Sequence, residues 1–311
     1  MNLFSKTATL TLAVVCLQAG LASQLAHSSQ QTSHIPEAKT PEEHEAYVSF
    51  YNEADSGKKL ELANILLARF PGTEFKPNVF LLMVQSLQGA KQYEKVINWA
   101  ERFLNDFPDH GSKGFVLQAL MNANQQVGNF PRTIEYAERL LLLEPQNLTA
   151  IYTIPFILSE RAVSSEPEGR QRELARATEL AGRGLSLKKP SSLAEGQWTQ
   201  YRGALHSALG LIHLNNKNYV EAQSEYLQAI SAEAKDAILY FRAGLAYSFD
   251  RKYDEALDLL AKSVFLKGIT ESQARTELER VYRIKHGVTV TGPELQAAIQ
   301  KTIDEAAASL K

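Results

Sequence analysis

Two stretches of the chain carry the same residue pattern at a fixed distance. Gly210–Gln223 reads GLIHLNNKNYVEAQ and Gly244–Leu257 reads GLAYSFDRKYDEAL. The offset 244 − 210 is 34 residues, and it is shared by the pairs Tyr219 and Tyr253, Glu221 and Glu255, and Ala222 and Ala256. A period of this length indicates stacked supersecondary units that bury a continuous core only together.

The residues at these positions have a physical role in packed helices. Gly210 and Gly244 leave room where two antiparallel helices cross, and Ala222 and Ala256 do the same from the opposite helix. Large residues then fill the ridges on either side. The pattern therefore predicts pairs of short amphipathic helices.

The same spacing resembles the tetratricopeptide repeat, whose pattern is W-x2-L-G-x2-Y, then A-x3-F, then P. Matching residues are Leu209, Gly210, Ala222 and Tyr226 in one unit and Tyr240, Gly244, Tyr247 and Ala256 in the next. His206, His213 and Leu260 replace aromatic residues of the pattern, and both closing prolines are missing. The resemblance implies an all-α fold, a right-handed α-solenoid of antiparallel helix pairs with capping helices at the C-terminus.

Earlier units keep the second helix and a proline behind it. Leu60–Pro71, Tyr93–Pro108 and Phe130–Pro145 each end in proline, and both offsets, 108 − 71 and 145 − 108, are 37. Proline lacks an amide donor and disfavours helix in the preceding residue. Pro71, Pro108 and Pro145 are therefore predicted to end one helix and set the turn to the next.

The solenoid is predicted to cover 41–311, with helix pairs beginning near Pro41, Pro77, Gly114, Leu148, Leu193 and Ala237. Its clearest repeats are 77–110, 114–147, 203–236 and 237–270, and 271–311 forms the capping helices. Pro155 is expected to kink or locally break its helix. Ser192 and Glu195 form a capping-box pattern, which predicts a helix start near Leu193.

The N-terminus reads as a secretory signal over 1–22, followed by a flexible linker over 23–40. Ala8–Ala22 is uncharged and mostly apolar. As a helix it would span roughly 22 Å, short of the roughly 30 Å of a bilayer core. We expect cleavage after Ala22 or Ala26, no stable membrane span afterwards, and a periplasmic or extracellular bacterial protein. Bulky Val15 before Cys16, the only cysteine, disfavours lipidation, although a lipid anchor there stays an alternative.

The composition argues against nucleic acid as a partner. The chain has 33 Lys and Arg against 35 Asp and Glu, with a pI near 6.4, so it lacks a broad basic field that would hold phosphates.

No catalytic, metal or cofactor pattern emerges. His206 and His213 are seven residues apart, beyond the four-residue spacing with which two helical imidazoles bind one zinc ion. Both occupy aromatic positions of the repeat, so we expect them to be packed core residues. Asp55–Lys59 (DSGKK) lacks the first glycine of a phosphate loop, and no G-x-S-x-G elbow is present. The chain is predicted not to be an enzyme.

The resemblance also implies where a partner binds, because first helices of successive tetratricopeptide pairs line a concave groove. By register the groove would include Leu81, Gln85, Gln88, Gln118, Asn122, Gln125, Tyr152, Phe156, Asn215, Phe241 and Phe249. Amides can hydrogen-bond a peptide backbone and aromatic residues can anchor side chains. The alternative is a merely solvated polar face.

These features predict an exported, non-catalytic adaptor or scaffold that binds a protein or peptide partner. One alternative is a structural component of an envelope or outer-membrane assembly complex. Another is an enzyme with an unrecognised site that involves His213.

Overall fold

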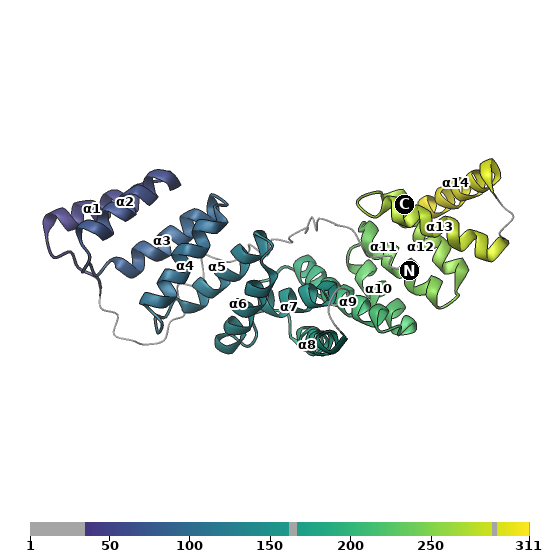
Figure 1. The fold of residues 1–311 in the computed structure, drawn as a ribbon, viewed down its shortest axis with the longest axis horizontal. Helices are drawn as coiled ribbons and strands as arrows, with labels where there is room; N and C mark the ends of the chain where they lie inside the picture. The colour runs from purple at the N-terminus through teal and green to yellow at the C-terminus, as the bar shows by residue number, and fades with distance from the viewer. Residues whose placement is uncertain (1–34, 162–166, 288–290, 311) are drawn as a thin grey trace. The chain divides into compact units, whose positions relative to one another are not determined.

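The computed structural model describes residues 35–161, 167–287 and 291–310, which contain fourteen α-helices and no strand (Figure 1). The prediction of an all-α helical repeat is therefore confirmed. The predicted signal peptide, and the linker up to residue 34, lie outside the described residues.

Helices follow one another in pairs joined by short turns. The pairs are α1 (Pro41–Asn52) with α2 (Ser56–Arg69), α3 (Lys76–Gly89) with α4 (Tyr93–Asp106), α5 (Lys113–Gln126) with α6 (Phe130–Leu143), α7 (Leu148–Arg161) with α8 (Pro167–Ser186), α9 (Glu195–Asn215) with α10 (Tyr219–Ala232), α11 (Ala237–Phe249) with α12 (Tyr253–Leu266), and α13 (Glu271–His286) with α14 (Gly292–Ser309).

The described helices form two compact units, an N-terminal unit that ends at Ala150 and a C-terminal unit that begins at Ile151. Within each unit most helices pack against their neighbours in the chain, for example α4 on α5 and α10 on α11. Successive first helices also meet, as α3 does with α5 and α9 with α11. This nearest-neighbour packing is the defining property of a helical repeat array.

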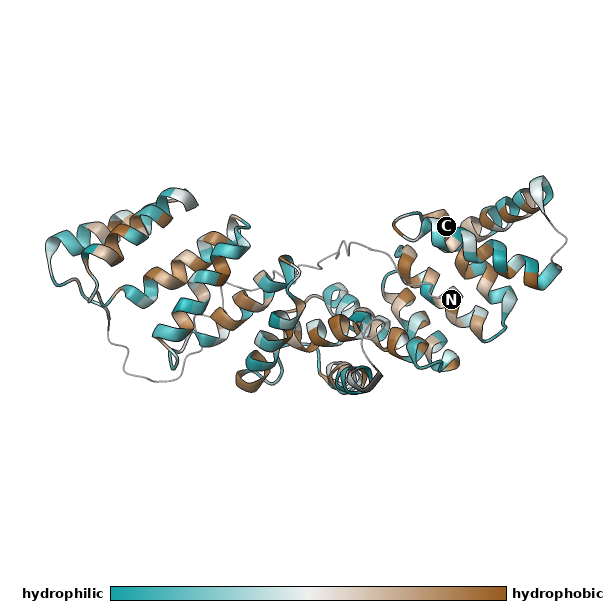
Figure 2. Ribbon diagram, viewed as in Figure 1, coloured by the Kyte–Doolittle hydropathy of each residue, from teal (hydrophilic) through white to brown (hydrophobic). Residues whose placement is uncertain are grey.

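Aromatic residues fill the core of the N-terminal unit. Phe80 and Phe103 are fully buried, and the ring of Trp99 lies 5.0 Å from that of Phe80. Helices α2 and α4 end one residue before Phe70 and Phe107, and Pro71 and Pro108 follow at exposed turn positions. Pro145 has the same place behind α6. Figure 2 shows both hydrophobic and hydrophilic residues along the helices.

The start of α9 differs from the prediction. The helix begins at Glu195, and Ser192 does not cap it. The N–H of the residue before the helix, Ala194, donates to Gln197 Oε1. The reason is burial: Leu193 is 5% exposed and its N–H donates to Pro190 O, so these residues form a turn before the helix. At Pro155 helix α7 continues without interruption from Leu148 to Arg161.

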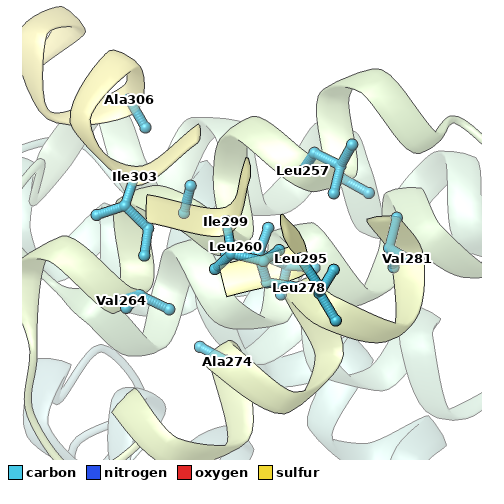
Figure 3. Close-up of a cluster of buried hydrophobic side chains, with 12 residues drawn as sticks. Leu257, Leu260, Val264, Ala274, Leu278, Val281, Leu295, Ile299, Ile303 and Ala306 are labelled. Carbon is cyan, nitrogen blue, oxygen red and sulfur yellow. The ribbon is translucent and has the colours of Figure 1, made fainter. Parts of the chain in front are cut away.

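The last helix covers the end of the C-terminal unit. Leu295, Ile299, Ile303 and Ala306 of α14 are at most 5% exposed and pack against α12 and α13 (Figure 3). Their partners include Leu260 of α12. Helix α14 thus buries one face on the end of this unit, and its capping role stays a prediction.

The turns inside four pairs share one left-handed backbone position. Lys91, Lys217 and Arg251 have φ of 55°, 62° and 63°, and Gly128 at the equivalent place has φ of 74°. Each lies two residues before the aromatic residue that begins the second helix. Left-handed backbone costs a residue with a Cβ about 1–2 kcal/mol, so three of these turns store strain that Gly128 avoids.

Lys217→Gly is expected to raise the free energy of unfolding by about 0.5–1 kcal/mol, because glycine relieves the left-handed strain but loses more backbone entropy on folding. Urea denaturation followed by circular dichroism measures the effect. Gly128→Ala is the matched control and should lower stability. A lower midpoint for Lys217→Gly would mean that the lysine side chain stabilises the turn more than its backbone strains it.

Ala222→Leu is expected to destabilise the chain by about 1–3 kcal/mol, because Ala222 is fully buried at a helix crossing and extra methyl groups would overpack it. The denaturation midpoint is again the measurement, with Val220→Leu as a control at a 58% exposed site on the same helix. An unchanged midpoint for Ala222→Leu would show that the crossing has spare room.

Candidate binding face

Helix α7 presents three side chains at four-residue spacing. Tyr152, Phe156 and Glu160 share one face of the helix, because residues four apart lie one above the other. The rings of Tyr152 and Phe156 lie 5.7 Å apart, and both side chains are half-buried. Burial raises the pKa of Tyr152 to about 12, and the charge of Glu160 adds to the shift. The face therefore combines two rings with a carboxylate.

An arginine from α11 completes this face. Arg242 Nη2 lies 2.6 Å from Glu160 Oε1, and the two side chains are 21% and 22% exposed. Burial lowers the pKa of Arg242, but the Glu160 carboxylate outweighs it and leaves this pKa raised. Arg242 thus stays a cation, and it lies 82 positions from Glu160 in the chain.

Helix α9 contributes a second contact to the end of α7. Asn215 Nδ2 donates to Ser159 O at 3.4 Å. We call Tyr152, Phe156, Glu160, Asn215 and Arg242 the first-helix cluster, because all five lie on first helices of their pairs. Aromatic residues and arginine are the types most enriched among residues that dominate protein-binding energies. The cluster is thus suited chemically to holding another protein chain.

Two further predicted groove residues lie on α11, and their surroundings differ. Phe241 is half-buried and packs against the hydrophobic core. Phe249 is 41% exposed, and its ring lies 5.5 Å from that of Tyr219. Phe249 is two helical turns beyond Arg242, so it extends the same face of α11. Phe241 serves the core, whereas Phe249 is available to a partner.

In the N-terminal unit the predicted residues lie on α3 and α5, which pack against each other. Gln85 is exposed, and Leu81 and Gln88 are half-buried. On α5, Gln118 Nε2 donates to Asn122 Oδ1 at 3.1 Å, and Gln125 is half-buried one turn on. An amide has two donors and an acceptor, so this bond leaves Gln118 and Asn122 further hydrogen-bonding capacity.

The repeat residues Gly210 and Gly244 lie at close helix crossings. A Cβ on Gly210 would come within 2.8 Å of the Tyr226 ring, and one on Gly244 within 2.7 Å of Leu260 Cγ. Ala222 and Ala256 are fully buried, and Tyr219 and Tyr253 are half-buried at the starts of α10 and α12. The glycines are thus required by contact with a neighbouring side chain.

The two histidines of α9 are separate from each other. His206 Nδ1 lies 2.7 Å from Glu225 Oε2 of α10, whereas His213 is half-buried and its Nδ1 has no partner among the described residues. Within the described ranges no three His, Cys, Asp or Glu side chains gather as metal ligands do.

Sequence reasoning missed Glu160 and Arg242. Extending the four-residue spacing of Tyr152 and Phe156 by one step leads to Glu160. No comparable signal marks Arg242, because its partner lies on a helix two pairs earlier in the chain.

The helix pairs define an α-helical repeat protein, and comparison with known proteins specifies the type. Part of a TPR repeat-containing protein from Cytophaga hutchinsonii superposes with a TM-score of 0.53 at 14% identity, covering 86% of this chain and 99% of that one. A tetratricopeptide repeat protein from Parabacteroides merdae gives a TM-score of 0.50 at 12% identity, covering 86% and 98%. The chain therefore has the tetratricopeptide repeat fold.

Sequence comparison adds a shorter likeness. No family model matches the chain. The rabbit nuclear autoantigenic sperm protein is 31% identical over 112 residues, which is 32% of this chain and 16% of that protein. The human protein of the same name is 28% identical over 116 residues, 35% of this chain and 14% of its own length. The matched stretch thus spans only about a sixth of these relatives.

No helix in the described part of the chain is both long enough and apolar enough to cross a membrane.

Proposed function

We propose that the chain is a non-catalytic scaffold that binds a protein or peptide partner at the first-helix cluster. The observation that carries the proposal is the Glu160–Arg242 pair beside the half-buried rings of Tyr152 and Phe156. Helical repeat arrays use the continuous surface of successive elements to bind other chains. Half-buried rings offer apolar contact, and the charged pair offers both a donor and an acceptor group to a peptide.

The binding test uses two matched phenylalanines. Phe249 on first helix α11 is 41% exposed, and Phe265 on second helix α12 is 42% exposed. The chain and its Phe249→Glu and Phe265→Glu variants serve as baits in a bacterial envelope extract. Isothermal titration then measures the affinity of each bait for the captured protein. We expect Phe249→Glu to abolish capture and Phe265→Glu to retain it. Equal capture by both variants, or equal loss, would reject this face as the binding site.

The proposal also includes export to the bacterial envelope. It rests on the uncharged apolar run Ala8–Ala22 with small residues at its end. Intact-mass measurement of the chain recovered from the periplasm should show loss of the first 22 or 26 residues, and Val14→Arg should keep the chain full-length in the cytoplasm. Labelling with a radioactive fatty acid should leave the chain unlabelled. An unprocessed chain would contradict export, and a labelled one would establish a lipid anchor.

A further inference from the structure

A second surface feature lies apart from the first-helix cluster, in the C-terminal unit. It is a pocket of about 470 Å³ between α10, α11 and α12. Its lining consists of Leu227, Ile230, Tyr240, Tyr247, Asp254, Glu255, Asp258, Leu259 and Lys262. The pocket shares no residue with the first-helix cluster and has apolar, aromatic and acidic groups together.

The apolar part of the pocket comes from side chains anchored in the core. Tyr240 is 5% and Leu259 7% exposed, whereas Leu227 at the surface is 44% exposed. Burial raises the pKa of Tyr240, and the Asp258 carboxylate adds to the shift, so this phenol is neutral and lies near a negative charge. The buried side chains of Tyr240 and Leu259 therefore form a fixed apolar wall, and Leu227 extends it at the surface.

The acidic part comes from α12. This helix contributes Asp254, Glu255 and Asp258 to the lining and one basic residue, Lys262. Lys262 Nζ bonds Asp258 Oδ2 at 2.7 Å, and Lys285 pairs with Asp254. Glu255 makes no ion pair with any residue that the structure describes. The surface around the pocket therefore keeps an excess of negative charge.

One cation of the chain lies near the aromatic part of the pocket, where its ion pair with Asp250 also holds it. Lys252 Nζ lies 5.8 Å from the centre of the Tyr247 ring. Attraction between a cation and an aromatic face is worth about 0.5–1 kcal/mol at exposed sites. A second cation that reached the pocket from outside would find Tyr247, Tyr240 and the Glu255 carboxylate, whose charge already helps to raise the pKa of Lys252.

We propose that this pocket receives an arginine side chain from a basic segment of a protein partner. The methylene stem of an arginine matches the apolar wall of Leu227 and Ile230. Its planar guanidinium stacks on tyrosine rings and donates to carboxylates in a fork that lysine lacks. Glu255 supplies one carboxylate, and Asp258, which already accepts from Lys262, supplies its second oxygen. The chain would thus have two binding surfaces, with different chemistry, in one unit.

The test titrates the full-length chain with N-acetyl-arginine methylamide and follows backbone amide shifts by NMR. The matched probe is the citrulline analogue, which has the same shape without the charge. We expect saturable shifts confined to α10, α11 and α12. The citrulline analogue should bind at least about five-fold more weakly, because it loses the attraction of its charge to the tyrosine rings and to a carboxylate.

Three variants separate the pocket from general attraction. Glu255→Gln and Asp258→Asn should each weaken arginine binding by about three- to ten-fold. Glu221→Gln removes the same charge from an exposed residue of α10 outside the pocket and should leave binding unchanged. Equal weakening by Glu221→Gln, equal binding of citrulline, or shifts spread over other helices would each overturn the proposal.

Discussion

A Tyr226→Ala variant is expected to lose about 3–5 kcal/mol of folding free energy, the usual cost of deleting a large buried aromatic side chain. Tyr226 is fully buried, and its ring fills the space that the missing side chain of Gly210 leaves. Alanine would leave a cavity at the crossing of α9 and α10. Urea denaturation followed by circular dichroism measures the loss.

Tyr226→Phe is the control for this prediction. The Tyr226 hydroxyl has no hydrogen-bond partner among the described residues, and burial raises its pKa well above the usual value. Burying an unpaired hydroxyl costs desolvation free energy, and phenylalanine removes that cost. Tyr226→Phe should therefore be as stable as the natural chain or more stable. If Phe destabilised the chain as much as Ala does, an interaction of the hydroxyl would carry the effect and the cavity explanation would fail.

Arg242→Ala is expected to cost about 1–3 kcal/mol, because it leaves the Glu160 carboxylate largely buried and without its partner. The value lies below that of a fully buried pair because about a fifth of each side chain meets solvent, which screens the charge. Thermal and urea unfolding of the purified variant provide the measurement.

A double-mutant cycle isolates the pair. Glu160→Gln combined with Arg242→Met removes both charges, and the double variant should recover most of the stability that Arg242→Met alone loses. Costs that simply add would show that the two residues do not stabilise each other. Binding of a captured partner by the double variant then separates the contribution of the charges from that of the rings.

Much of the fold follows from local patterns. The spacing of Gly210, Ala222 and Tyr226 reports contacts between helices adjacent in sequence, and such contacts recur with the period of the chain. The predicted start of α9 was too early. The capping pattern at Ser192 favours a helix from Leu193, but burial of Leu193 keeps these residues in a turn, and the helix begins at Glu195. Local preference is a weak guide where a tertiary contact opposes it.

The candidate site was less predictable. Its aromatic residues, Tyr152 and Phe156, have helical spacing and could be identified from the sequence. Arg242 could not, because its role depends on how far α11 lies from α7, which no repeat pattern specifies. Phe241 shows the converse. Its register in the repeat predicts a groove residue, but its side chain packs against the hydrophobic core.

The Glu160–Arg242 contact also has a kinetic consequence. Most contacts in each unit join helices adjacent in the chain, so folding closes only short loops and should be fast. A contact between residues 82 positions apart requires the intervening helices to be in place first. It should be absent from the folding transition state. Arg242→Ala should therefore accelerate unfolding while leaving the refolding rate nearly unchanged, which would make this ion pair a determinant of how long the native state persists.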